Sequence, residues 1–316
     1  MTETSTVVVR SLVREAEDVL GLTLARPDGA PLPEWVPGAH IDLVLTPELV
    51  RQYSLCGDPS DRSQYQIAVL REAASRGGSE YVHAELEEGD EVGLRGPRNH
   101  FELLEAPWYL FIAGGIGVTP ILPMVEQVAK SDSEFSILYG GRRKASMAFT
   151  DRLGRYGSKV QFVPQDVEGL LDLKVALGNL APDGKVYCCG PEALISAVEE
   201  LCVSLDPDVL HVERFAVREI DESTIAGQRS VRVVLDRSGK VLTVPPDRSI
   251  LDVVLEAGLD VPYDCSEGIC GSCEVKVLDG DIEHRDEVLT KFEQESNTAM
   301  MICCSRARGE RIVLDL

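Results

Sequence analysis

The stretch CSEGICGSC, residues 265–273, decides how the C-terminal part of the chain is interpreted. It places Cys265, Cys270 and Cys273 in the spacing C-x4-C-x2-C, and Cys303 follows after 29 further residues in the segment MMICCS. This is the spacing of plant-type [2Fe-2S] clusters. A short loop can wrap only three thiolates around two irons and two sulfides, so the fourth must come from another segment. We therefore predict Cys265, Cys270, Cys273 and Cys303 as metal ligands.

Two alternatives remain open at this point. The cysteines could hold structural zinc, although zinc prefers paired C-x2-C knuckles and the x4 gap fits it poorly. Cys304 could replace Cys303, because neighbours on a predicted strand point to opposite faces; the 29-residue gap favours Cys303. Gly268 and Gly271 permit a tight ligand loop and let backbone N–H groups approach the sulfurs.

The residues around this stretch predict a compact α+β module, residues 229–316. Residues 231–245 predict a strand, a Ser-Gly turn and a second strand, and residues 249–258 predict a helix with Ser249 as its N-cap. Further strands are expected at 273–280 and at the C-terminal end. The polar segment before the module, residues 216–228, has no clear period, and we interpret it as a linker.

Upstream of the linker, residues 107–215 predict an α/β domain. The continuous apolar run WYLFIA, residues 108–113, is typical of a strand buried on both faces. Strand signals recur downstream with helical segments between them, at 135–140, 159–164, 185–190 and 209–215. This alternation predicts a parallel, doubly wound sheet.

Residues 1–106 consist of short strand signals broken by turn residues, with one helical segment at 79–86. Two strands and a Pro-Asp-Gly turn are expected within residues 7–29, and further strands at 40–45, 51–55 and 65–70. A small antiparallel β-barrel is the simplest fold for this pattern.

The first domain carries a flavin signature in two parts. Arg51, Tyr53, Ser54 and Leu55 belong to RQYSL, where the arginine can pair with a phosphate, the tyrosine can stack on an isoalloxazine ring and the serine can reach flavin N5. Alternation puts Arg51, Tyr53 and Leu55 on one side of the strand. Taken alone, such a match is common.

The second part is a glycine turn that leads into a helix. Gly77, Gly78 and Ser79 form a predicted anion site at the helix N-terminus, with Ser79 as cap and donor. An ordinary capped turn would look the same. Arg51 and this turn would hold one phosphate from two sides, which suits FMN; no adenine-binding insertion is evident for FAD.

A nicotinamide signature lies in the central domain. Gly114, Gly115 and Gly117 in GGIGVTP would let the backbone approach a pyrophosphate, and Thr119 is the expected N-cap of the helix that follows, with Pro120 at its first position. Without a second signal, this is also compatible with a simple strand-to-helix turn.

The second signal is CCGP, in which Cys189, Gly190 and Pro191 end a later strand and lead into a helix. Both loops should lie at the carboxyl edge of the sheet, where open α/β folds bind ligands. We predict that the Cys189 thiol lies near the reactive carbon of a nicotinamide and that Cys188 is a core residue.

Composition excludes several classes of partner. The net charge is −22, with 53 acidic and 31 basic residues, so the chain lacks the basic surface that binds nucleic acid. No apolar run reaches the roughly 20 residues that span a bilayer, and the N-terminus lacks the pattern of a signal peptide. Five of nine cysteines fall in the last 52 residues, which indicates metal chemistry in a reducing cytoplasm rather than disulfides.

These three signatures, in this order, resemble the phthalate dioxygenase reductase family within the ferredoxin–NADP reductase superfamily. The similar segments are RQYSL, RGGS, GGIGVTP, CCGP, CSEGICGSCEVKVLDGDIEHRD and MICCSRA, so the resemblance covers essentially the whole chain. It extends to vanillate demethylase reductases and to the reductase portion of self-sufficient P450 fusions. The resemblance implies FMN in the barrel, NADH in the α/β domain and a [2Fe-2S] cluster in a β-grasp ferredoxin domain.

The resemblance also implies roles for individual residues. Arg51 would contact the flavin phosphate together with Gly78 and Ser79, Tyr53 would pack on the ring, and Ser54 would face N5. Thr119 would lie by the nicotinamide. Phe215, in HVERF, would shield the flavin face until nicotinamide displaces it, although a core aromatic at a strand end is an equal reading of that residue.

The expected activity follows from the order of cofactors. Nicotinamide donates two electrons as hydride, an iron–sulfur cluster accepts one, and flavin can do both. We expect an NADH-dependent reductase that supplies a terminal oxygenase, Rieske-type first and cytochrome P450 second, and that works as a monomer. Arg142 and Arg143 leave NADPH open, because arginine there can bind a 2′-phosphate. A free-flavin reductase and a nucleotide-binding iron–sulfur sensor are the remaining alternatives.

Overall fold

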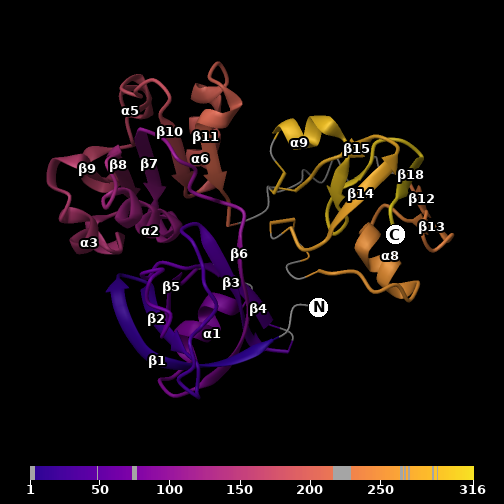
Figure 1. The fold of residues 1–316 in the computed structure, drawn as a ribbon, viewed down its shortest axis with the longest axis horizontal. Helices are drawn as coiled ribbons and strands as arrows, with labels where there is room; N and C mark the ends of the chain where they lie inside the picture. The colour runs from indigo at the N-terminus through magenta and orange to yellow at the C-terminus, as the bar shows by residue number, and fades with distance from the viewer. Residues whose placement is uncertain are drawn as a thin grey trace. The chain divides into compact units, whose positions relative to one another are not determined.

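The computed structural model describes residues 4–47, 49–72, 77–215, 229–263, 266, 268–269, 271–286, 288–289 and 291–316. The predicted linker 216–228 and the predicted ligands Cys265 and Cys270 lie outside this part of the chain. The chain divides into two compact units, Thr2–Glu213 and a unit that contains Arg214–Leu316. Each unit is described by itself below (Figure 1).

The first part of unit Thr2–Glu213 is a six-stranded antiparallel sheet with the strand order β4-β3-β6-β1-β2-β5. The two edge strands, β4 and β5, contact each other, so the sheet curls around its apolar side chains. The short helix α1, Gly78–Ala84, contacts both of these edge strands. The strands are β1 (Ser5–Ala16), β2 (Val19–Ala25), β3 (Ala39–Thr46), β4 (Leu49–Ser54), β5 (Tyr65–Leu70) and β6 (Glu91–Asn99).

The second part of this unit is a parallel five-stranded sheet with the order β11-β10-β7-β8-β9. Alternate residues of β7 enter different cores: Phe111 packs with α2, and Ile112 packs with α6. Helices therefore cover both faces, as the buried apolar runs predicted. The strands are β7 (Trp108–Gly114), β8 (Glu134–Gly141), β9 (Val160–Pro164), β10 (Lys185–Cys189) and β11 (Leu210–Glu213).

The helices of the parallel sheet are short, and several are single turns. The longer ones are α2 (Val118–Val128) and α6 (Glu192–Cys202). The others are η1 (Gly115–Gly117), η2 (Lys144–Ser146), α3 (Thr150–Gly154), η3 (Gly157–Lys159), α4 (Gln165–Glu168), α5 (Leu173–Gly178) and η4 (Pro207–Val209).

The C-terminal unit is a mixed sheet with the order β13-β12-β18-β14-β16, in which β12 and β18 run parallel. Helix α8, Ile250–Glu256, packs against β13 and begins with a capping box between Ser249 and Asp252, as predicted for Ser249. The strands are β12 (Val231–Leu235), β13 (Val241–Val244), β14 (Glu274–Asp279), β15 (Ile282–Glu283), β16 (Ala299–Met301), β17 (Arg306–Ala307) and β18 (Arg311–Leu314), and the remaining helix is α9 (Lys291–Ser296). The predicted α+β fold of the C-terminal module is confirmed.

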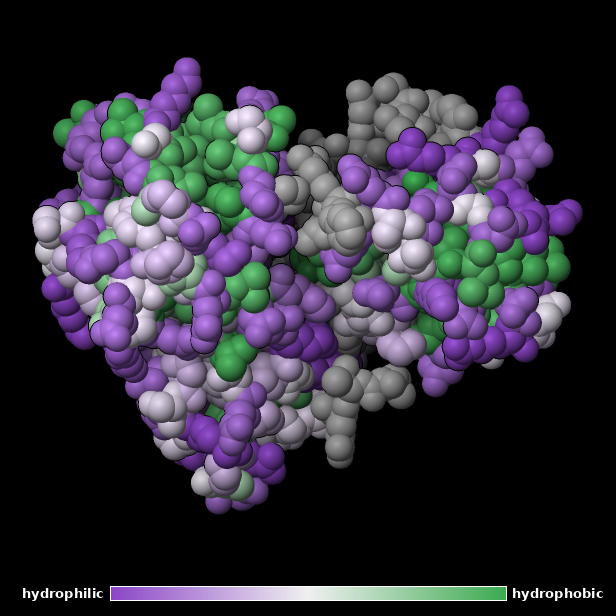
Figure 2. Space-filling model, turned by 45° about the horizontal axis from the view of Figure 1, so that its top comes forward, coloured by the Kyte–Doolittle hydropathy of each residue, from purple (hydrophilic) through white to green (hydrophobic). Residues whose placement is uncertain are grey.

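The surface of the protein is largely polar on the face that Figure 2 shows, where hydrophilic side chains surround smaller apolar areas. Large apolar side chains that remain exposed include Val167, Leu170 and Val203. Among the described residues, no helix has the length and apolar character needed to cross a bilayer.

Candidate functional site

Strand β4 holds the first predicted flavin residues at the edge of the antiparallel sheet. Arg51 and Tyr53 pair with Leu43 and Ile41 of β3, and cross-strand partners share a face of the sheet. The aliphatic part of Arg51 covers Gly78 of α1, where an added Cβ would lie 2.4 Å from Arg51 Cγ. Burial raises the pKa of the Tyr53 hydroxyl. Arg51 and the start of α1 are thus brought together, as predicted.

One detail of the flavin prediction, the capping role of Ser79, was wrong. Helix α1 begins at Gly78 with Gly77 as its N-cap in the left-handed region, at φ 91°. Ser79 therefore lies inside the first turn, and its hydroxyl accepts a hydrogen bond from the Glu72 N–H at 3.2 Å. Leu55 follows the end of β4, and its fully buried side chain lies in the same core against which Tyr53 packs, as the alternation predicted.

The two predicted nicotinamide loops lie against each other at the carboxyl edge of the parallel sheet. A Cβ added to Gly117 would lie 2.3 Å from the carbonyl oxygen of Cys189, and one added to Gly190 would lie 2.9 Å from Gly114 Cα. Gly115 has a φ of 55°. Only glycine allows this approach of the backbones, because any side chain would overlap main-chain atoms. The sequence signal therefore identified two loops that pack directly on each other, and their role in nicotinamide binding stays a prediction.

Thr119 is not the N-cap of α2, which was the prediction. The helix begins at Val118 with Gly117 as its N-cap. Thr119 is buried, and its hydroxyl donates a hydrogen bond to the Ile116 carbonyl at 2.9 Å. In a helix, the Ile116 carbonyl would accept a hydrogen bond from the N–H of residue 120, but Pro120 has no N–H. The Thr119 hydroxyl donates to this carbonyl instead. Pro191 is the N-cap of α6, so CCGP leads into a helix as predicted.

A glutamate that we did not predict joins the two sheets. Glu213 is the last residue of β11, and its carboxylate accepts a hydrogen bond from Ser54 Oγ at 3.2 Å. Glu213 is also the register partner of Cys189 on β10. Burial raises the pKa of Glu213 to about 8, and the hydrogen bond from Ser54 lowers it.

The pKa of the Cys189 thiol depends on its burial and on its neighbour Glu213. Burial raises the pKa of the Cys189 thiol well above its usual value, and the nearby Glu213 and Cys188 raise it further. Cys189 is therefore a neutral thiol. Cys188 points into the other core, on the α6 side, as predicted for a structural cysteine. Glu213 lies in the segment HVERF, at the end of a predicted strand. A carboxylate at such a position is usually a solvent-exposed surface residue, so the sequence alone did not indicate a role for it.

A second polar group surrounds Ser54 on β3 and β6. His40 is the cross-strand partner of both Ser54 and Arg98, and it is buried. Burial lowers the pKa of His40 to about 3, with further lowering by Arg98 and His100. The fully buried Asp42 accepts hydrogen bonds from Arg98 at 2.5 Å and from Gln52 at 3.0 Å. Ser54 thus lies in a buried, preorganised polar environment.

Phe215, the predicted shielding aromatic, follows β11 and falls in the C-terminal unit. Its side chain is 39% exposed. The alternative prediction, a core aromatic at the end of a strand, is therefore wrong. Its predicted role toward a flavin stays a prediction.

In the C-terminal unit, two of the four predicted cluster ligands lie among the described residues. Cys273 and Cys303 are buried, and the Cys303 sulfur contacts the Cys273 thiol and accepts a hydrogen bond from the Gly268 N–H. Gly268 and Gly271 have φ values of 77° and 73°, which turn the ligand loop tightly. Two converging thiols and a backbone donor aimed at sulfur fit an iron–sulfur cluster.

The position of the fourth ligand differs from the expectation in one respect. Strand β16 ends at Met301, so Cys303 and Cys304 lie in the turn that follows and not on the strand. The Cys304 sulfur also contacts Cys303, and it lies 3.8 Å from both the Met301 carbonyl oxygen and the Ser305 hydroxyl. The Gly268 N–H faces the Cys303 sulfur, and a Cβ on Gly268 would lie 2.4 Å from Cys304 Sγ, so Gly268 lies beside both cysteines.

Comparison with known proteins assigns two of the domains. Residues 111–200 match the oxidoreductase NAD-binding domain family, and residues 233–308 match the 2Fe-2S iron-sulfur cluster binding domain family. The chain is 39% identical to the phenoxybenzoate dioxygenase subunit beta of Ectopseudomonas oleovorans over 98% of this chain and 96% of that protein. It is also 39% identical to the phthalate 4,5-dioxygenase reductase subunit of Pseudomonas putida, over 95% of this chain and 94% of that one.

Solved structures give the same result. A phthalate dioxygenase reductase, described as a modular structure for electron transfer from pyridine nucleotides to [2Fe-2S], matches with a TM-score of 0.72 and 34% identity over 99% of this chain and 98% of that one. An intact type IV self-sufficient cytochrome P450 monooxygenase matches with a TM-score of 0.91 and 44% identity over 99% of this chain, but only 41% of that chain.

These matches confirm the predicted three-part fold, the oxidoreductase class and the cofactors: NADH and a [2Fe-2S] cluster from the two domain families, and FMN from the whole-chain relatives. The predicted resemblance is confirmed as well. The chain belongs to the phthalate dioxygenase reductase family.

Proposed function

We propose that this protein is the reductase component of an oxygenase system, which takes electrons from NADH and passes them to a separate Rieske-type terminal oxygenase. The observation that carries the proposal is the hydrogen bond from Ser54 to Glu213, which joins the flavin sheet to the nicotinamide sheet beside Cys189. Two sheets that share one polar centre can bring two cofactors into contact. The homologous reductase subunits of dioxygenases support this reading.

The flavin domain positions FMN through β4 and α1. FMN, when bound, accepts two electrons from nicotinamide and releases them singly. Arg51 and the N–H groups of Gly77, Gly78 and Ser79 would hold its phosphate, because Arg51 already lies against Gly78. Tyr53 would cover the ring, Ser54 would face N5, and Leu55 would contribute through its backbone because its side chain is buried.

The nicotinamide domain holds the dinucleotide at its carboxyl edge. Gly114, Gly115 and Gly117 would line the pyrophosphate path, because the close backbone packing there leaves N–H groups and no side chains. The buried Thr119 and the CCGP loop (Cys189, Gly190 and Pro191) would border the nicotinamide ring, and Phe215 would cover the flavin in its absence. The neutral Cys189 thiol excludes water without adding charge beside the ring.

Glu213 controls a proton at this centre. Below about pH 8 its carboxyl group holds a proton, since burial raises the pKa to that value. The protonated group lies within hydrogen-bond distance of Ser54 Oγ, and so it keeps negative charge away from the point where the two ring systems would meet. Above this pH, a partly buried carboxylate would stand there instead.

In the C-terminal unit, we propose Cys265, Cys270, Cys273 and Cys303 as the ligands of the [2Fe-2S] cluster. The 29-residue spacing and the burial of Cys303 beside Cys273 support this set over one that contains the less buried Cys304. The domain limits that accompany this assignment are 1–106, 107–215, 216–228 and 229–316.

A cytochrome P450 is the second candidate partner. The match to a self-sufficient P450 favours it, because that structure is 44% identical to this chain and the phthalate dioxygenase reductase structure is 34% identical. For the coenzyme, NADH is preferred over NADPH because residues 111–200 match the NAD-binding domain family; of the two arginines that could bind a 2′-phosphate, Arg143 is paired with Glu17 at 3.1 Å and Arg142 is exposed. We propose that the protein acts as a monomer in the cytoplasm, where thiols stay reduced.

The test separates the flavin from the cluster by its electron acceptors. Ferricyanide accepts electrons from the flavin, and cytochrome c accepts single electrons from the cluster. Wild-type protein should reduce both with NADH, whereas Cys270→Ser should reduce ferricyanide and lose cytochrome c reduction. Equal cytochrome c reduction by both proteins would contradict the role of the cluster and favour a free-flavin reductase. Pull-down with the holoprotein, followed by identification of the bound oxygenase, distinguishes the two partners.

A further inference from the structure

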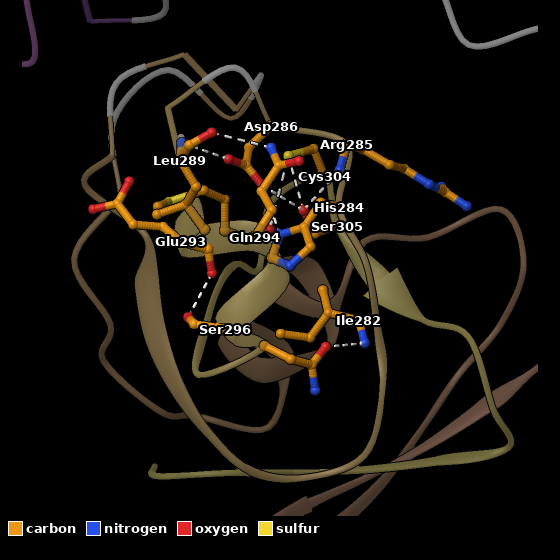
Figure 3. A network of polar contacts seen from close by, with 12 residues as sticks. Ile282, His284, Arg285, Asp286, Leu289, Glu293, Gln294, Ser296, Cys304 and Ser305 are labelled. Carbon is orange, nitrogen blue, oxygen red and sulfur yellow. Dashed lines mark hydrogen bonds and ion pairs between the residues drawn. The ribbon is translucent and has the colours of Figure 1, made fainter. Parts of the chain in front are cut away.

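A buried polar network lies next to the turn that carries Cys303, away from the four predicted cysteine ligands. Figure 3 shows the side chains of His284, Asp286 and Ser305 converging, with Cys304 beside them. Asp286 and Ser305 are 4% and 1% exposed. Buried polar groups of this kind require a full set of partners, and the partners here link two segments of the module.

The Asp286 carboxylate is the centre of this network. Its Oδ1 accepts a hydrogen bond from Ser305 Oγ at 3.0 Å, and its Oδ2 accepts one from the Leu289 N–H at 2.9 Å. The Arg285 N–H donates to Ser305 Oγ at 3.1 Å, so the serine proton is free to point at Asp286. Both carboxyl oxygens act as acceptors, which is the pattern of an ionised carboxylate. The His284 ring, with Nδ1 at 3.4 Å from Oδ1, makes a longer contact.

The same network reaches the ligand loop. A Cβ added to Gly268 would lie 3.2 Å from Asp286 Cα and 2.4 Å from Cys304 Sγ. The Gly268 N–H in turn donates to the Cys303 sulfur. The ligand loop, the turn that carries Cys303 and the Asp286 segment therefore pack directly on one another.

We infer that Asp286 is a positioning residue of the iron–sulfur cluster: through Ser305 it fixes the turn of Cys303 against the ligand loop, and its buried negative charge lowers the reduction potential of the cluster. The inference rests on the proposed assignment of Cys303 as a ligand. Reduction adds an electron to the cluster, and a nearby negative charge in a poorly solvated site disfavours that electron. Hydrogen-bonded groups behind the ligands also set their orientation.

The decisive variant is Asp286→Asn in the full-length holoprotein. The amide keeps the shape of the side chain and removes its charge. We expect an upward shift of the cluster midpoint potential in a redox titration followed by EPR, together with changed g values, while the FMN potential stays unchanged. Asp315→Asn is the matched control, because it removes one carboxylate of the same module that pairs with Arg237 at 2.6 Å instead of with the Cys303 turn.

Ser305→Ala tests the mechanical link separately, because it keeps the charge. It should change the g values and speed the loss of iron to a chelator. Wild-type potential and g values in Asp286→Asn would overturn the inference, even if its melting temperature falls. If Asp286→Asn is isolated without a cluster, the Ser305→Ala variant provides the test. An EPR signal and an iron loss rate like those of the wild-type protein would overturn the inference. A changed EPR signal and faster iron loss, together with a cluster restored in Asp286→Glu, would support it. Wild-type protein without iron would instead contradict the proposed function.

Discussion

Gly117 lies so close to Cys189 that a Cβ atom on Gly117 would be 2.3 Å from the Cys189 carbonyl oxygen. The atoms that it would meet belong to the backbone, so no rotamer change relieves the overlap. The contact holds the GGIGVTP and CCGP loops together, and the proposed nicotinamide site depends on it.

Gly117→Ala should therefore destabilise the first unit by about 1–3 kcal/mol, the usual range for overpacking, and should slow the reduction of FMN by NADH. Urea unfolding and stopped-flow absorbance measure the two effects. Gly178→Ala is the control, since nothing lies within 4 Å of a Cβ at that position. Equal stability of the two variants would show that the loops can separate without cost.

Glu213→Gln should remove a pH dependence that the wild-type protein has. The folded-state pKa of Glu213 is raised from 4.5 to about 8, so its contribution to stability is complete below about pH 4.5 and is lost as the pH rises through 8. Within that window, each pH unit changes the free energy of unfolding by up to about 1.4 kcal/mol. Urea titrations from pH 5 to pH 9 should give a smaller slope for the glutamine variant.

The rate of FMN reduction by NADH should follow the same group. In the wild-type protein, the rate should change near pH 8, where the carboxyl group beside Ser54 ionises. The glutamine variant should lack this inflection. An identical profile in both proteins would remove Glu213 from the reacting centre.

Cys303→Ser and Cys304→Ser form a matched pair for the fourth ligand. The Cys303 sulfur has Gly268 as a backbone donor, and the Cys304 sulfur lies near Met301 and Ser305. Cys303→Ser should lose the visible absorbance and most of the iron, and Cys304→Ser should retain both. The reverse pattern would assign the cluster to Cys304.

Arg51→Ala should weaken FMN binding roughly tenfold to a hundredfold, the loss expected from a hydrogen bond to a charged group. Fluorescence of released flavin measures the dissociation constant. Arg62→Ala, which removes a surface pair with Glu34 in the same sheet domain, should leave FMN binding unchanged. Similar affinities in the two variants would place the phosphate elsewhere.

Local patterns in the sequence predicted most of this fold and much of the site. WYLFIA predicted a strand buried on both faces because its side chains enter two different cores, as Phe111 and Ile112 do. The cysteine spacing identified the C-terminal module, since the number of residues between ligands is itself a geometric constraint. Glycines at GGIGVTP and CCGP predicted two loops at one edge of a parallel sheet.

What sequence reasoning missed depends on contacts between distant residues or on backbone conformation. Glu213 acquires its role from Ser54, which lies 159 residues away. The N-cap positions were assigned to Ser79 and Thr119 because hydroxyl side chains are good caps, but Gly77 and Gly117 occupy them. Asp286 ends one of the segments that carry the resemblance, but no role was predicted for it, because its contact with Ser305 forms only when the Cys303 turn is folded.

The central claim is that electrons from NADH reach a cluster held by cysteines of the C-terminal module through a bound flavin. An anaerobic titration of the purified protein with NADH, followed by visible absorbance and EPR, tests it most directly. The account predicts bleaching of the flavin and the appearance of a [2Fe-2S] EPR signal, with FMN, iron and sulfide present in the starting protein. A flavin that bleaches while the cluster stays oxidised, or a protein that contains neither iron nor sulfide, would contradict it.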